Sequence, residues 1–161
     1  MNVKTAAGFT IIELVLVIAI IGILAVTVVP QWDTTTGLNV NFTARQMAND
    51  FRYAQALSMS TGLRYRFVVL SSSSYEITNN AGSAIILPSG GTQMTLTQGV
   101  TIGTLTNMPN NLIAFDSRGI PYTDTGSPGT ALASTAAVPV TASGMTRSVQ
   151  VTPQTGYVTL Q

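Results

Sequence analysis

The sequence predicts an α+β protein in which a long N-terminal helix packs on an antiparallel β-sheet head. Three observations predict this fold. The apolar run from Ile11 to Val29 has close to the roughly 20 residues that a helix needs to cross a bilayer core. Apolar residues resume at helical spacing from Val40. From Leu63 onward the spacing changes to two, which is typical of half-buried strands.

The composition restricts the classes of function. The chain has 161 residues, which suits one domain, and 7 Lys and Arg stand against 6 Asp and Glu. So small a net charge gives no indication of nucleic-acid or acidic partners. The sequence contains neither Cys nor His, so thiol chemistry and the commonest general base and metal ligand are absent. Its acids are scattered without metal-ligand spacing. We therefore expect no enzyme, no cofactor, no metal site and no small-molecule substrate.

The N-terminal run admits several interpretations. A secretory signal peptide would have a shorter apolar core and a small-residue cleavage site after it, and "VTVVPQW" offers no such site. A plain membrane anchor fits the length, with Lys4 keeping the start on the cytoplasmic side. Neither interpretation explains Glu13, an acid placed near the start of an otherwise uncharged run. An ionisable group inside a membrane segment is by default functional and requires a partner.

The stretch "AAGFTIIELVLVIAIIGILAVTVVP" resembles the class III signal of type IV pilins and type II secretion pseudopilins. In that family a short leader ending in glycine is removed before an aromatic residue. The resemblance therefore implies cleavage between Gly8 and Phe9 by a prepilin peptidase, with N-methylation of Phe9. Glu13 stands at the family's glutamate position, and Pro30 stands where many members carry a proline that weakens the helix.

A physical argument supports a role for Glu13 in assembly. Cleavage after Gly8 leaves a cationic amine on Phe9, about 6 Å from Glu13 along a helix axis at 1.5 Å per residue. A buried ion without a partner costs several kcal/mol. A subunit alone in the membrane would therefore gain by pairing its carboxylate with the amine of a neighbour. We interpret Glu13 as the residue that sets the register of assembly.

The chain is expected to have four parts. Residues 1–8 are a cleaved leader, 9–30 a transmembrane and filament-core helix, 31–62 the second half of the helix, and 63–161 a β-rich head. We expect an interruption near residues 33–39, because "DTTTGLN" combines Gly37 with three threonines after the helix-breaking Pro30.

The second half of the helix has one apolar face. Arg45, Asn49, Arg52 and Gln55 lie off this face, and Gly62 is the expected end of the helix. The apolar face is made by Val40, Ala44, Met47, Ala48, Phe51, Ala54 and either Leu57 or Ser58. It is wide enough to pack on a sheet.

The head contains many short strand candidates separated by Gly, Pro and Asn, which favours antiparallel sheet. The last two candidates, "RSVQVT" and "YVTL", are joined by "PQTG" and are expected to form a hairpin. The others are "LRYRFVVL", "YEIT", "AIIL", "QMTLT", "VTIGTL", "LIAF" and "AVPVTA". The stretch "TDTGSPGTALAST" has no clear period and is expected to be a surface loop.

Two stretches of the head, "FDSRGIP" and "RSVQVTPQTGYV", resemble segments of pseudopilin H and of the fimbrial T minor pilins. Some fimbrial T proteins bind DNA through arginines in the last hairpin. In this chain no arginine follows the glycine of that hairpin, and Arg147 alone is nearby. Because phosphate binding requires several clustered cations, we expect no nucleic-acid binding and keep Arg147 only as a candidate.

The resemblance implies a minor structural subunit with a pilin-like fold, held in the cytoplasmic (inner) membrane before assembly, with its head in the periplasm or outside. Its expected partners are other pilin or pseudopilin subunits, the prepilin peptidase, the membrane and its assembly platform. The first hypothesis is a type II secretion pseudopilus. The alternative is a type IV or mannose-sensitive haemagglutinin-type pilus, which serves adhesion, motility, pilus biogenesis or DNA uptake. A third possibility is an anchored domain that never assembles.

Overall fold

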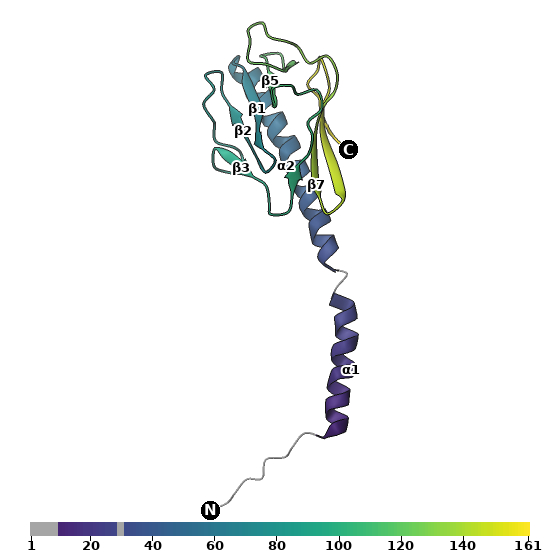
Figure 1. Cartoon of the computed structure of the whole chain (residues 1–161). Coiled ribbons are helices and arrows are strands. Elements are labelled where there is room, and N and C mark those ends of the chain that lie inside the picture. The colour runs from purple at the N-terminus through teal and green to yellow at the C-terminus, as the bar shows by residue number, and fades with distance from the viewer. Residues whose placement is uncertain (1–9, 29–30) are drawn as a thin grey trace, which may run out of the picture. The chain divides into compact units, whose positions relative to one another are not determined.

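The computed structural model describes the chain outside residues 1–9 and 29–30, and it describes no side chains for residues 25–36. The chain divides into two compact units, Met1–Thr35 and Thr36–Gln161, which are treated separately. The first contains helix α1 (Ile11–Val28). The second contains most of helix α2 (Gln31–Thr61) and all of the strands (Figure 1).

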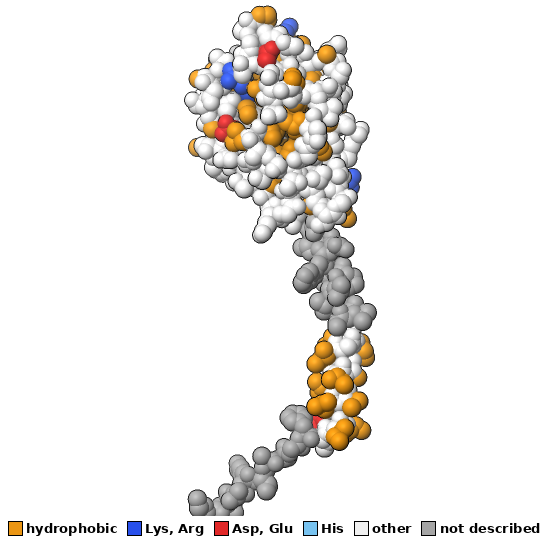
Figure 2. All heavy atoms as spheres, in the orientation of Figure 1, with side chains coloured by type: hydrophobic (Ala, Val, Ile, Leu, Met, Phe, Trp, Pro, Cys, Tyr) orange, Lys and Arg blue, Asp and Glu red, His pale blue; other side chains and the backbone are white. Residues whose placement is uncertain are grey.

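Apart from Glu13, helix α1 is apolar on every side that the structure describes. Its large aliphatic side chains between Ile11 and Leu24 are all exposed, from 45% at Val17 to 86% at Ile11, and they cover the visible face of the helix in Figure 2. Among the helices of the described residues, none is both long and apolar enough to cross a membrane. The span expected at residues 9–30 includes Phe9 and Pro30, which lie outside the described residues.

Helix α2 differs from the expected one in a single respect. The interruption expected near residues 33–39 is wrong, because the helix runs without a break from Gln31 to Thr61. Two contacts explain why Gly37 is accommodated. The side-chain amide of Asn41 donates to the carbonyl of Gly37 at 2.9 Å, and the sulfur of Met145 lies where a larger residue would place its Cβ. The helix ends as predicted before Gly62, whose φ of 73° only glycine adopts without strain.

The strands form two antiparallel sheets within the described residues. In the first, the spatial order is β3-β2-β1-β5-β6, with β1 at Tyr65–Ser71, β2 at Ser74–Thr78, β3 at Gln93–Thr95, β5 at Leu112–Phe115 and β6 at Pro121–Tyr122. In the second, the order is β4-β7-β8-β9, with β4 at Thr101–Ile102, β7 at Ala136–Ala142, β8 at Met145–Val151 and β9 at Val158–Leu160. Figure 1 shows β1, β2 and β3 on one side of α2 and β7 on the other.

Most of the predicted strands are present. The terminal hairpin is confirmed, since β8 pairs with β9 from Val149 opposite Leu160 to Val151 opposite Val158. The prediction of a strand at "AIIL" is wrong, because only Ala84 forms a bridge there and Pro88 soon follows. The sequence did not indicate β6, a two-residue strand whose first residue is a proline.

The core is shared by α2 and both sheets. Predicted face residues from Val40 to Ala54 are at most 2% exposed and belong to one cluster with strand residues of both sheets. At its centre the ring of Phe51 stacks on Phe67 at 3.8 Å, and Phe67 stacks on Tyr75 at 4.7 Å. Of Leu57 and Ser58, the two residues expected at the end of this face, Ser58 is the buried one. Its hydroxyl donates to the carbonyl of Ala54 and accepts the N–H of Tyr65. The expected α+β fold, with a long helix packed on antiparallel sheet, is confirmed.

Candidate functional site

Glu13, the acid that the sequence analysis singled out, lies exposed in the first turn of α1. Its backbone N–H donates to the carbonyl of Thr10 at 3.1 Å and contacts the Thr10 hydroxyl at 3.4 Å. Thr10 therefore caps the helix, and an acid three residues later is favourable beside the positive end of the helix dipole. The same carboxylate is the only charge among the side chains that the structure describes on α1. A local capping role and a role in pairing are compatible.

Gly8, Phe9 and Pro30 all lie outside the described residues. The proposed cleavage, methylation and helix break at these positions therefore stay predictions.

Arg147, the candidate nucleic-acid contact, lies on β8 with its Nε donating to the side-chain oxygen of Asn41 at 2.8 Å. It lines a hollow of about 430 Å³ together with Arg45, Leu38, Phe42 and Asn41. The structure thus brings a second arginine, from α2, to the same surface. The sequence did not show this pairing, because the two residues are about a hundred positions apart.

Two turns of the head are held together by a residue that the sequence analysis placed only off the apolar face. The side-chain amide of Gln55 donates to the carbonyl of Gly119 at 2.9 Å and to that of Thr155 at 3.0 Å. Gly119 belongs to the turn after β5, and Thr155 belongs to the turn between β8 and β9. The "FDSRGIP" and "PQTG" stretches therefore meet at α2.

Asp116 organises the first of these turns. Its carboxylate accepts the backbone N–H groups of Arg118 and Ile120, each at 2.9 Å, and pairs with the Arg118 guanidinium at 3.0 Å. Partial burial alone would raise the pKa of this carboxyl. The hydrogen bonds from Ile120 and Arg118 outweigh that effect and lower its pKa below the ordinary value. These contacts give the acid and glycine of "FDSRGIP" a structural role in the turn.

The expected surface loop after β6 is ordered around two opposite charges. The Arg64 guanidinium donates to the carbonyls of Gly126 and Pro128 and lies 4.3 Å from the centre of the Tyr122 ring. Asp124 accepts the N–H groups of Gly126 and Thr130. Arg64 therefore helps to hold the loop after β6 in place.

A buried acid that the sequence analysis did not single out lies on α2 itself. Asp50 is 2% exposed, and the hydroxyl of Tyr75 donates to its carboxylate at 2.7 Å. Burial raises the pKa of Asp50 above its ordinary value, and the hydrogen bond from Tyr75 opposes this shift only in part. Burial and the adjacent Asp50 raise the pKa of Tyr75. Asp50 falls between the apolar face and the polar face of α2, a position from which burial cannot be predicted.

A groove of about 440 Å³ opens between the two sheets, lined by Val69, Leu70, Ile102, Leu105 and Met108 among others. The visible face of the head in Figure 2 is largely uncharged, with apolar side chains gathered near its middle. Among the described residues, no three His, Cys, Asp or Glu side chains lie together as metal ligands would.

Comparison with known proteins adds two findings. Residues 3–29 match the model of the "Prokaryotic N-terminal methylation motif". The chain also resembles the crystal structure of the type IV minor pilin FimU of Pseudomonas aeruginosa (strain PAO1) in space group P21, with a TM-score of 0.57 and 13% identity. That alignment covers 80% of this chain and 92% of FimU. The same pilin in space group P65 aligns with a TM-score of 0.53 and 12% identity, over 75% and 91% of the two chains.

No curated protein sequence matches the chain. The structural likeness establishes a pilin-like fold, and the N-terminal match establishes the methylation motif. Neither comparison distinguishes the pseudopilin H and fimbrial T group that "FDSRGIP" suggested.

Proposed function

We propose that this protein is a minor pilin-like structural subunit, processed by a prepilin peptidase and assembled into a filament through its apolar N-terminal helix. One observation carries the proposal: a single chain combines the methylation motif at residues 3–29 with a pilin-like head. This combination supports a structural role and not catalysis. Other pilin-like subunits are the expected partners.

The motif also suggests the order of events. The precursor is held in the cytoplasmic membrane with Lys4 on the cytoplasmic side and the head in the periplasm or outside. The peptidase cuts between Gly8 and Phe9 and methylates the new amine. Mass spectrometry of the mature N-terminus tests both steps. A mature chain that still begins at Met1 would contradict the proposal and favour an anchored domain that never assembles.

Glu13 is proposed to pair with the amine of Phe9 on a neighbouring subunit. The exposed carboxylate on an otherwise apolar stretch of α1 supports this role, because burial between subunits would leave it without water. A Glu13→Gln variant keeps the size and removes the charge. We expect it to be cleaved normally and to enter filaments poorly. Glu76→Gln, which removes an acid on β2, is the matched control, and undiminished incorporation of Glu13→Gln would contradict the pairing.

Two filaments remain candidates. The sequence analysis placed a type II secretion pseudopilus first, and the "FDSRGIP" stretch resembles pseudopilin H and the fimbrial T minor pilins alike. The resemblance of the fold to FimU, described as a type IV minor pilin, favours a pilus. A deletion strain discriminates between them, since loss of secreted proteins with normal piliation indicates the pseudopilus and the converse indicates the pilus.

A further inference from the structure

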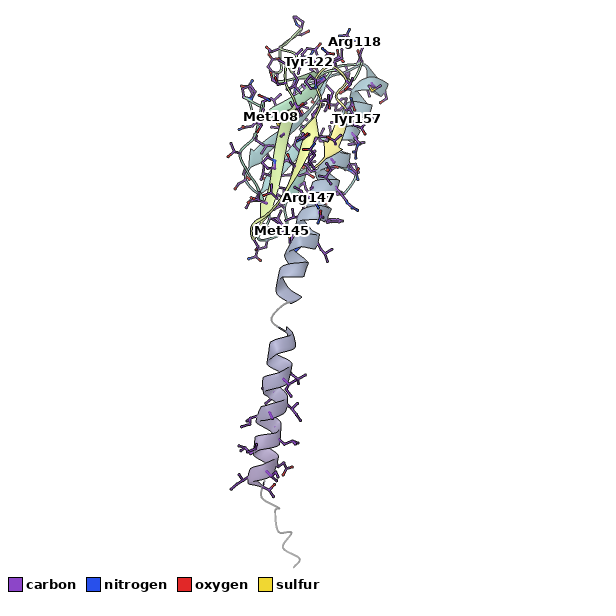
Figure 3. All side chains as sticks on the ribbon, turned by 90° about the vertical axis from the view of Figure 1, so that its right-hand side faces the viewer. Met108, Arg118, Tyr122, Met145, Arg147 and Tyr157 are labelled. Carbon is purple, nitrogen blue, oxygen red and sulfur yellow. The ribbon has the colours of Figure 1, made fainter. Side chains whose placement is uncertain are left out.

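One surface of the head combines exposed apolar side chains with two arginines. Leu38 and Phe42, one turn apart on α2, are 68% and 67% exposed, and Met145 at the start of β8 is 50% exposed. Arg45 and Arg147 line the same hollow as Leu38 and Phe42, and Met145 lies against Gly37 of α2. Figure 3 shows Met145 and Arg147 close together beside α2. These five residues are called the basic apolar surface.

This surface carries two positive charges. Among the residues with described side chains, no acid lines the hollow that holds Arg45 and Arg147, and Asp50, which lines an adjoining hollow with Arg45, is buried and bonded to Tyr75. The ion pair found among the described residues is Arg118–Asp116, which lies at the other end of the head from Arg147 in Figure 3. Arg147 has a neutral partner, the side-chain oxygen of Asn41. Two guanidinium groups beside one hollow are therefore available to an anion.

We propose that the basic apolar surface docks on the anionic phospholipid surface of the membrane that holds the unassembled subunit. Arginines beside Leu, Phe and Met side chains are the composition of surfaces that lie in the interface of a bilayer. The guanidinium groups pair with lipid phosphates, and the three apolar side chains enter the headgroup boundary. This inference rests on the proposed function, because it requires the N-terminal segment to be held in the membrane.

The chain connection favours the lipid surface as the occupant. Leu38 comes ten positions after Val28, the last residue of α1, and that length of chain reaches at most about 36 Å even when fully extended. A head tethered so closely is at a high effective concentration for the lipid surface. Docking then becomes an intramolecular event. Two arginines and three apolar side chains are enough to shift its equilibrium toward the docked state. A second copy of the chain has no comparable tether.

The absence of cysteine in the sequence allows a direct test with the full chain. A Thr146→Cys variant, carrying a fluorophore between Met145 and Arg147, is reconstituted in vesicles that contain quencher-labelled headgroups. One set is phosphatidylcholine, and the other also contains phosphatidylglycerol. We expect stronger quenching with phosphatidylglycerol, lost in 0.5 M salt. Because each cation near such a surface contributes about a five-fold shift, Arg45→Gln with Arg147→Gln should lower the ratio of docked to free heads about 30-fold.

The matched control is Arg118→Gln, which removes one exposed arginine from a different part of the head and should leave the quenching unchanged. Leu38→Ser with Phe42→Ser should weaken docking on both lipids. Equal quenching on the two lipids would overturn the inference. Quenching that rises with the protein-to-lipid ratio would also overturn it and would indicate docking between copies. Carbonate extraction separates the two proposals: a chain that is not retained in the membrane contradicts the proposed function, whereas a retained chain without lipid-dependent quenching contradicts only this inference.

Discussion

Substitution of Gly156 offers the sharpest test of how the head is held together. This glycine has a φ of 63°, and a Cβ at its position would overlap the carbonyl oxygen of Gly119, lie 2.5 Å from Nε2 of Gln55 and approach the Phe115 ring at 3.1 Å. The positive φ alone costs alanine about 1–2 kcal/mol. The overlap with a backbone oxygen adds about 1–3 kcal/mol, because two turns must separate. We therefore expect Gly156→Ala to lower the free energy of unfolding by about 2–5 kcal/mol.

Two other glycines separate these contributions. Gly144, in the turn between β7 and β8, has a φ of 80°, and a Cβ added there would meet no atom within 4 Å. Gly144→Ala should therefore cost only the backbone term of about 1–2 kcal/mol. Gly119→Ala should fall between them, since its φ is 80° and its nearest contacts, Gln55 at 3.0 Å and Met59 at 3.1 Å, are flexible side chains. Urea unfolding of the full chain in detergent, followed by near-UV circular dichroism, measures all three. Equal losses for Gly156→Ala and Gly144→Ala would refute the contact between the turns.

Phe51→Ala should cost about 3–5 kcal/mol through the cavity left in the aromatic stack, whereas Phe42→Ala on the same helix should change stability by less than about 0.5 kcal/mol; similar losses would contradict the described core. Because the folded pKa of Asp50 is raised above its unfolded value of 3.8, its contribution to stability is full below that pH and is lost as the pH rises through the folded pKa. Asp50→Asn should therefore raise the melting temperature at pH 7 and not at pH 3.5, and an unchanged melting temperature at pH 7 would contradict the buried acid. Asp116→Asn removes a carboxyl of lowered pKa and should be destabilising at pH 7. Gel shifts with duplex DNA should show no tight, salt-dependent binding through Arg147, and such binding would restore DNA uptake as a candidate.

The sequence predicted what depends on local pattern. Helical spacing identified the buried face of α2, and Gly62 identified its end, because both depend on residues within a few turns of one another. Contacts between distant residues could not be predicted. The bond from Gln55 to Thr155 joins positions that no periodicity relates. The interruption expected near residues 33–39 was wrong for the same reason, since Met145, far along the chain, packs on Gly37.

The N-terminal motif could be predicted from the sequence, whereas the basic apolar surface of the head could not. The methylation motif is contiguous, so residues 3–29 could be recognised from the sequence and were matched independently. The basic apolar surface could not be recognised, because Arg45 lies on a helix and Arg147 lies on a hairpin near the end of the chain. Neither arginine is unusual alone. Their relation exists only after β8 has been placed beside α2.

The two helices require different surroundings, and this difference supports assembly. Helix α2 buries one face in the head, where Ala44 and Phe51 are fully buried. Helix α1 buries no described aliphatic side chain within its own unit, and each Leu, Ile or Val left in water forgoes about 1.5–3 kcal/mol of transfer free energy. Summed over the described side chains from Ile11 to Leu24, that loss exceeds the whole stability of a typical domain. This loss favours cover by lipid or by other helices, as the proposed function requires. The proposed pairing of Glu13 would distinguish the two environments, since a neighbour's amine can neutralise its charge and a lipid tail cannot.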